Sequence, residues 1–144
     1  QMVLSGKTQD LEKLSSVFKE NKIKNIKLPV SAPFHCSLMN KATEIMTKEL
    51  QKLNFKKGNN VLISNITADE IFNANELKNL LAKQIENRVR WRESVINMIN
   101  KGVNKFIEIG PGKVLSGLVK RIDRNVIVDS INTEDDIKKI KIHD

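Results

Sequence analysis

Several residue types are scarce in this chain of 144 residues, and each scarcity argues against a class of protein. The single cysteine, Cys36, excludes an internal disulfide framework and a cysteine-rich zinc site. Tyrosine is absent and aromatic residues are only 4%, so the stacking platforms of single-strand nucleic-acid binders are missing. No apolar run approaches the roughly 20 residues of a membrane-spanning helix. Residues 1–6 also lack the pattern of a signal peptide, and we therefore expect a cytoplasmic, reducing location without membrane partners.

Positive charge is abundant. The net charge is +8, from 25 lysines and arginines against 17 aspartates and glutamates. Such a balance favours an anionic partner, which could be a nucleic acid, an anionic lipid surface or an acidic protein. The basic residues are scattered, however, and the densest groups, at 56–57 and 88–92, are short. We therefore interpret the lysines as a solvated surface rather than a nucleic-acid site, and an acidic protein partner remains open.

Helices and strands are predicted to alternate along the chain. Apolar residues recur at helical spacing in six segments: residues 8–18, 37–53, 75–85, 91–102, 113–122 and 133–141. Short apolar runs predict strands at residues 2–5, 26–28, 61–64, 105–109 and 126–128. Thr8 and Asn75 are the predicted N-caps of two helices, and Gly102 is a predicted C-terminal signal. The run at 61–64 is typical of a strand buried on both faces.

This alternation predicts an α/β fold with a parallel sheet. Ligands in such sheets usually bind at the carboxyl ends of the strands, which points to the loops after Leu28, Ser64 and Ile109. The first two strands and their helix are too few to cover a two-sided core. Either these strands join the main sheet, or a partner strand that precedes them is missing.

His35 is the residue that most favours chemistry. It follows an extended segment bracketed by Pro29 and Pro33, and it precedes a long predicted helix. This arrangement can present a general base at the end of a strand. The alternative is a histidine that caps the helix or satisfies a buried backbone group. Cys36 is better interpreted as a small buried residue than as a nucleophile, because adjacent residues at a helix start point in different directions.

Other polar motifs are less specific. Residues 110–113 lack the spacing of a phosphate-binding loop, because Val114 follows the lysine, and they predict a tight turn before a helix that could favour an anion. The arginines between 88 and 92 indicate a solvated face or a docking patch for an acidic protein. No metal site is predicted. Residues 134–136 fit the acidic first turn of a helix, and His143 lies at a terminus.

Five segments resemble, in order and spacing, the malonyl-coenzyme A:acyl carrier protein transacylases, an acyltransferase family of fatty acid synthesis. They are residues 1–6, 28–39, 64–68, 83–91 and 108–115. The segment at 83–91 resembles the family's Arg-Gln-x-x-x-Pro-Val-x-Trp element, with Arg88 in place of the proline. The resemblance covers residues 1 to about 130 and indicates the carboxy-terminal half of such an enzyme.

The resemblance implies a particular fold. The family has an α/β-hydrolase-like parallel-sheet core with an inserted ferredoxin-like small subdomain. Residues 1–30 would form the later part of that small subdomain, and residues 31–144 would form the second half of the α/β acyltransferase core.

The resemblance also implies an activity. In the family, a serine attacks the malonyl thioester of coenzyme A, and the phosphopantetheine thiol of acyl carrier protein then accepts the malonyl group; no cofactor or metal is bound. By position, His35 resembles the general base, and Gln84 resembles the glutamine whose backbone carbonyl orients that ring. Asn65 and Val114 match active-site walls. Phe34 resembles a bulky residue of malonyl-selective members, and excluding a methyl branch is typically worth about 1–3 kcal/mol.

The chain departs from the family in what it lacks. No Gly-x-Ser-x-Gly nucleophile motif occurs in it, nor do the family's malonyl-binding arginine and oxyanion-hole glutamine, which belong to the amino-terminal half. We therefore expect no turnover by the chain alone. Three interpretations follow: a part of the transacylase that needs its amino-terminal half, a non-catalytic module that binds acidic acyl carrier protein, or an acyltransferase domain of a polyketide-type synthase. The last is disfavoured, because no linker-like flanks are visible.

Overall fold

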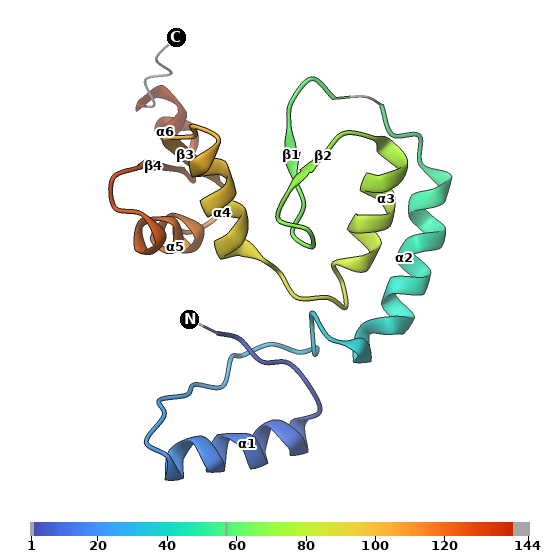
Figure 1. Ribbon diagram of the computed structural model, residues 1–144, viewed down its shortest axis with the longest axis vertical. Helices are drawn as coiled ribbons and strands as arrows, with labels where there is room; N and C mark the ends of the chain where they lie inside the picture. Colours follow the sequence, from blue (N-terminus) through green and yellow to red (C-terminus); the bar gives the residue numbers. More distant parts are fainter. Residues whose placement is uncertain (1, 57, 140–144) are drawn as a thin grey trace. The chain divides into compact units, whose positions relative to one another are not determined.

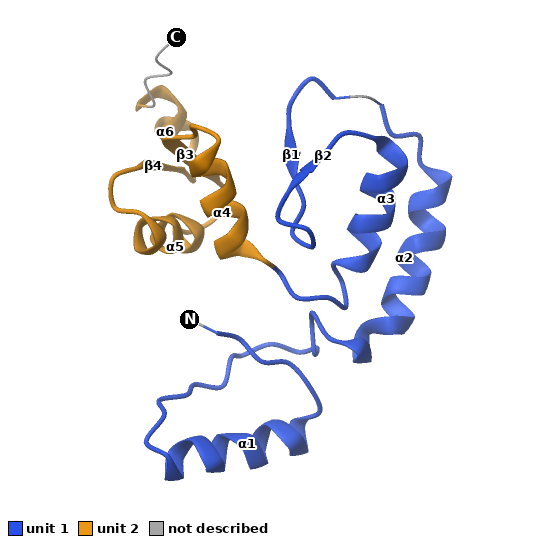
Figure 2. Cartoon of the chain, viewed as in Figure 1, with its two compact units in different colours: residues 1–89 blue, residues 90–144 orange. Residues whose placement is uncertain are grey.

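The chain divides into two compact units, Gln1–Val89 and Arg90–Asp144 (Figure 2). The computed structural model describes residues 2–56 and 58–139 (Figure 1). Over these ranges the structure mixes helices with short strands, which confirms the predicted α/β class at that level. Within the same ranges, no helix combines the length and the apolarity that a membrane crossing requires.

The first unit is mainly helical. Its helices are α1 (Thr8–Glu20), the 3₁₀ turn η1 (Ser37–Met39), α2 (Asn40–Lys52) and α3 (Ala74–Lys83). Helices α2 and α3 pack against each other. The ammonium group of Lys78 on α3 donates to the backbone oxygen of Leu53 at 2.6 Å and lies 5.3 Å from the ring centre of Phe55. These contacts tie the end of α2 to α3, the helix that leads into the candidate site.

The predicted N-caps in this unit are wrong by one or two positions. Thr8 is the first residue of α1, and Lys7 occupies the N-cap without a side-chain hydrogen bond. Asn73, rather than Asn75, caps α3, because its Oδ1 accepts the backbone N–H of Glu76 at 2.7 Å. Asn73 has the extended backbone that an N-cap requires, whereas Asn75 already lies within the helix.

The strand prediction at 61–64 is only partly correct. The structure has a short antiparallel pair, β1 (Leu62–Ile63) with β2 (Glu70–Ile71), in which Leu62 is paired with Ile71. Val61 is 64% exposed and Leu62 is 42% exposed, so the expected burial on both faces is wrong. An antiparallel hairpin tolerates one solvated face, which a strand inside a parallel sheet does not.

No strand forms at residues 2–5 or 26–28 in the described part of the chain, so these two predictions are wrong. A strand exists only when a neighbour completes its hydrogen-bonded ladder. The second segment is followed instead by a local turn, in which the N–H of Val30 donates to the oxygen of Leu28 at 2.9 Å. Met2 is 85% exposed and Ile26 is 75% exposed, as apolar residues without a covering layer must be.

The second unit contains the parallel strands. Its elements are α4 (Trp91–Asn100), β3 (Lys105–Ile109), α5 (Val114–Ile122), β4 (Ile127–Ile131) and α6 (Glu134–Lys139). Strands β3 and β4 pair in parallel from Lys105 opposite Ile127 to Ile109 opposite Ile131, with α5 as the connection between them. The predicted helices and strands are thus confirmed here, although β4 runs further than expected. Residues 140–141 of the last predicted helix lie outside the described residues.

A small apolar core holds this unit together. Val95, Val119 and Val126 are buried, and each comes from a different segment of the unit. Partly buried side chains surround them: Trp91, Met98, Ile99, Phe106, Ile122 and Val128. Helices α4 and α5 pack against each other, and α5 also packs against both strands.

Glycines make the sharp turns that the sequence predicted. Gly102 follows α4 with φ of 95°, and its N–H donates to the oxygen of Ile99 at 2.9 Å. Gly110 and Gly112 have φ of 139° and 92° in the turn between β3 and α5. Such angles cost a residue with a side chain more than they cost glycine. The tight turn at this position, instead of a phosphate-binding loop, is confirmed.

Candidate functional site

His35 has an unusual backbone. Its φ is 63°, in the left-handed region that few residues other than glycine adopt, although histidine is among those enriched there. The backbone N–H of His35 donates to the carbonyl oxygen of Ile85 at 3.0 Å. This long-range hydrogen bond holds the histidine at the carboxyl end of α3.

The ring of His35 is held at the same place. Its Nδ1 atom lies 2.8 Å from the backbone carbonyl oxygen of Gln84. A carbonyl oxygen can only accept, so Nδ1 carries the proton and donates it to this contact. In the neutral ring, Nε2 then keeps its lone pair. The side chain of His35 is exposed, and this nitrogen is therefore suited to take a proton from a group that approaches it.

The end of α3 explains why these carbonyl groups accept. Gln84 is the C-cap of α3, and Ile85 follows it directly. The last carbonyl groups of a helix have no partner within the helix. They therefore remain available to donors from other segments, such as the backbone and the ring of His35.

Asn65 contacts the side chain of the same glutamine. Its Nδ2 donates to Oε1 of Gln84 at 3.0 Å, and both side chains are half-buried. Thus the structure brings together three of the predicted site residues: His35 and Asn65 both bind Gln84, one through its backbone and one through its side chain. The sequence predicted the first contact through the family resemblance and did not predict the second.

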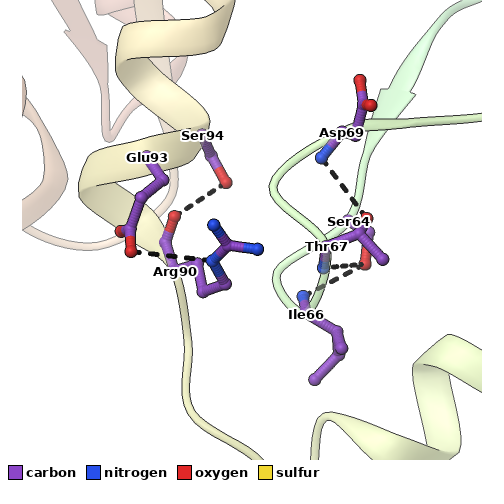
Figure 3. Close-up of polar contacts among 7 residues, drawn as sticks. All are labelled: Ser64, Ile66, Thr67, Asp69, Arg90, Glu93 and Ser94. Atoms are coloured by element: carbon purple, nitrogen blue, oxygen red, sulfur yellow. Dashed lines mark hydrogen bonds and ion pairs between the residues drawn. The ribbon is translucent and has the colours of Figure 1, made fainter.

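The loop that carries Asn65 is organised by the preceding serine. Ser64 is only 4% exposed. Its hydroxyl oxygen accepts the backbone N–H groups of Ile66 and Thr67 at 3.1 and 3.3 Å (Figure 3). Its own N–H donates to the oxygen of Asp69 at 2.9 Å. These contacts close a turn around Asn65, which the sequence did not predict.

The remaining predicted residues take different places. Phe34, next to His35, is 49% exposed. The Cys36 thiol is half-buried and donates to the oxygen of Pro33 at 3.2 Å, which fits a packing role. Val114 begins α5 in the second unit and is 70% exposed, so its place in the site stays a prediction.

One of the arginines considered as a docking patch is used locally. Nε of Arg90 lies 3.6 Å from Oε1 of Glu93, and the Ser94 hydroxyl donates to the Arg90 carbonyl oxygen at 3.0 Å (Figure 3). Arg90 is the N-cap of α4, and both partners lie in the first turns of that helix. Its side chain therefore contributes to the start of the helix.

The helix amino-terminus that was expected to favour an anion is occupied by the chain's own carboxylate. Glu108 on β3 accepts the N–H groups of Leu115 and Ser116 at 3.1 and 2.7 Å. The Ser116 hydroxyl and these backbone donors lower the pKa of Glu108 below its ordinary value.

In the described part of the chain, no group of three or more histidine, cysteine, aspartate or glutamate residues is arranged to hold a metal ion.

Comparisons with known proteins show what the chain as a whole is similar to. No family model matches the chain. A malonyl CoA-acyl carrier protein transacylase from Bacillus subtilis is 40% identical over 139 residues, which are 96% of this chain and 44% of that protein. The crystal structure of an acyl carrier protein S-malonyltransferase from Vibrio cholerae has a TM-score of 0.87 and 35% identity, and covers 94% of this chain and 45% of that one.

A second similar structure contains a partner. It is a type II PKS acyl-carrier protein in complex with its malonyl-transacylase, with a TM-score of 0.87, 30% identity, and coverage of 93% of this chain and 44% of that one. The chain thus spans less than half the length of the relatives it matches. The resemblance predicted from five short segments is confirmed along nearly the whole sequence. The chain is similar to malonyl CoA-acyl carrier protein transacylases over almost all of its own length and over less than half of theirs.

Proposed function

We propose that this chain supplies the general-base histidine of a malonyl CoA-acyl carrier protein transacylase, an acyltransferase of fatty acid synthesis. The observation that carries the proposal is the 2.8 Å contact between Nδ1 of His35 and the carbonyl oxygen of Gln84. It leaves Nε2 as the basic atom on an exposed ring. The nucleophilic serine would come from outside residues 1–144, because the chain has no Gly-x-Ser-x-Gly motif.

The reaction would proceed in two transfers. The serine hydroxyl attacks the carbonyl carbon of malonyl coenzyme A, and its proton passes to Nε2 of His35. The tetrahedral adduct collapses, and the coenzyme A thiolate leaves with the proton from the imidazolium. The phosphopantetheine thiol then gives its proton to Nε2 and attacks the malonyl-serine ester, and the serine leaves with that proton. Throughout, the Gln84 carbonyl keeps the ring in one orientation and stabilises its charged form.

Other residues would shape the site. Phe34 stands beside the base and would limit the room for a branched acyl group, while Asn65 and Val114 would line its walls. Asn65 is supported by the hydrogen-bond partner that it shares with His35. Val114 belongs to the second unit, and only the family resemblance supports its role. No bound cofactor is needed, because the substrates are malonyl coenzyme A and the phosphopantetheine arm.

The wider setting follows from the same relationship. We infer that residues 1–30 are the later part of a ferredoxin-like small subdomain and residues 31–144 the second half of an α/β-hydrolase-like core. The partners would be acyl carrier protein and the amino-terminal half of the enzyme, in the cytoplasm. The complex between a similar transacylase and its carrier protein supports the first partner.

A second candidate function is binding without catalysis. Acyl carrier proteins are acidic, and the net charge of +8 on this chain is complementary to them. Binding by this chain alone that weakens steeply with salt, in the absence of any transfer activity with an added amino-terminal half, would favour this second function.

Replacing the base tests the proposal. In the complete protein, His35→Ala should lower the rate of malonyl transfer by roughly a thousandfold or more, because the serine and the thiol lose their proton acceptor. His143→Ala, which removes the chain's other histidine, should leave the rate unchanged. The fold should survive the first substitution, as monitored by circular dichroism, because the side chain is exposed. Transfer by His35→Ala at the wild-type rate would refute the assignment.

A further inference from the structure

The side chain of Gln84 has a partner that the proposed mechanism does not use. Oε1 of Gln84 accepts a hydrogen bond from Nδ2 of Asn65 at 3.0 Å. The backbone oxygen of the same Gln84 accepts the ring proton of His35 at 2.8 Å. One glutamine therefore links a loop amide to the catalytic ring, entirely within the first unit.

We propose that Asn65 is a positioning residue for His35, because it fixes the end of α3 through the Gln84 side chain. The inference rests on the proposed function, since a ring that transfers protons must keep one nitrogen protonated and the other free. It gives Asn65 a role that is separate from contact with the substrate.

The end of α3 needs such a constraint. Gln84 is the C-cap, and its N–H still donates to the oxygen of Leu80 at 3.0 Å. The N–H groups of Ile85 and Glu86 donate to oxygens only three residues earlier, at 3.2 and 3.3 Å. Terminal turns of helices fray more readily than their interiors. A hydrogen bond from a separate segment restricts the peptide group whose oxygen must reach the ring.

The loop of Asn65 is built to supply that constraint. The buried hydroxyl of Ser64 accepts hydrogen bonds from the N–H groups of Ile66 and Thr67, the two residues that follow Asn65 in the sequence (Figure 3). Ala68 has φ of 60° and is 5% exposed, so the loop is fixed by burial at its other end. Asn65 therefore presents its amide from a fixed backbone, and little order has to be gained when the contact forms.

The consequence concerns the tautomer of His35. With the Gln84 oxygen in place, the proton stays on Nδ1, and Nε2 is available in every neutral ring. When that oxygen moves away, the two tautomers compete, and a ring with its proton on Nε2 cannot accept another there. A loss of positioning therefore appears as a change of tautomer, which a general loosening of the fold would not produce by itself.

Nitrogen NMR of the complete protein, labelled with ¹⁵N-histidine, measures this directly. The wild-type His35 ring should show one protonated nitrogen, Nδ1, and its signals are assigned by their loss in His35→Ala. Asn65→Ala and Gln84→Ala should each shift the ring toward a mixture of tautomers. Gln84→Ala keeps the carbonyl group that binds the ring and removes only the side-chain amide. Asn87→Ala is the matched control, because Nδ2 of Asn87 donates to the oxygen of Lys83 at 2.8 Å near the same helix end, and its loss should preserve the wild-type spectrum.

Transfer rates complete the test. Each alanine variant should slow malonyl transfer by roughly five- to tenfold, the size expected for one side-chain hydrogen bond, and the double variant should be no slower than either. Asn87→Ala should stay near the wild-type rate. If Asn65→Ala fails to fold, Gln84→Ala carries the test alone.

Two outcomes overturn the inference. The first is that Asn65→Ala or Gln84→Ala keeps both the wild-type tautomer and the wild-type rate. The second is that the rate losses of the two single variants multiply in the double variant. If one of these results is found while His35→Ala still abolishes transfer, only the positioning role fails. If His35→Ala transfers normally, the proposed function itself fails.

Discussion

The ring of His35 and the backbone of Gln84 are 49 positions apart in the sequence, and their Nδ1 and carbonyl oxygen atoms lie 2.8 Å apart in the structure. In the proposed function, a carbonyl group would take the place that a carboxylate holds in a serine protease triad. It would orient the ring and fix its tautomer without adding a full negative charge. The orientation of the His35 ring therefore depends on where α3 ends.

The start of α3 offers a stability test with a matched control. Asn73→Ala removes the side-chain acceptor of the Glu76 N–H and should lower the free energy of unfolding by about 1 kcal/mol. Asn75→Ala, within the first turn of the same helix, should change it by less than about 0.5 kcal/mol. Urea unfolding of both variants measures the difference. Equal effects would mean that Asn73 does not cap the helix.

The hydrogen bonds of Glu108 should make the stability of the fold depend on pH. Its hydrogen bonds to Ser116 and Leu115 lower its pKa in the folded state below the ordinary value of 4.5. A lowered pKa contributes stability above pH 4.5, and this contribution is lost as the pH falls below that value toward the folded pKa. Glu108→Gln should therefore be less stable than wild type at neutral pH, with the gap narrowing in acid.

Thermal unfolding at neutral pH and near pH 3 measures that gap. Glu134→Gln serves as the control, since it removes an exposed carboxylate from the first turn of α6. The difference in stability between this variant and wild type should change far less between the two pH values. A Glu108→Gln deficit that stays the same across the whole pH range would contradict the assigned role of the carboxylate.

Replacing Phe34 should change the selectivity between malonyl and methyl-branched malonyl thioesters. In the complete protein, Phe34→Ala should raise the use of a methyl-branched malonyl thioester relative to malonyl coenzyme A by roughly ten- to a hundredfold, because the ring no longer excludes the methyl group. Competition between the two thioesters measures the ratio of kcat/KM values. Phe72→Ala, at an exposed phenylalanine of the same unit, should leave the ratio unchanged. A ratio that does not respond to Phe34→Ala would remove this residue from the acyl pocket.

Regular elements were predictable where the local sequence decides them. The strand at 105–109 was predicted with the bounds that the structure has, because a short apolar run lies between two glycine-containing turns. Helices followed from apolar residues at helical spacing. The predicted strands at 2–5 and 26–28 failed, since an apolar run does not reveal whether a neighbouring strand is present to pair with it.

The site was predictable in part. Spacing alone singled out His35, and the family resemblance supplied Gln84 as its partner. Two hydrogen bonds were not predicted: the one from the backbone N–H of His35 to the oxygen of Ile85, and the one from Asn65 to Gln84. Both depend on where α3 ends and on the turn after Ser64, which are three-dimensional outcomes that residue types do not encode locally.

The most direct test of the account asks where malonate is attached. This chain alone, incubated with malonyl coenzyme A, should show no change in intact mass. The complete protein should gain one malonyl group, and peptide mapping should place that group on a serine outside residues 1–144. A stable malonyl adduct on Cys36 or on a serine within the chain would contradict the claim that this chain contributes the base and not the nucleophile.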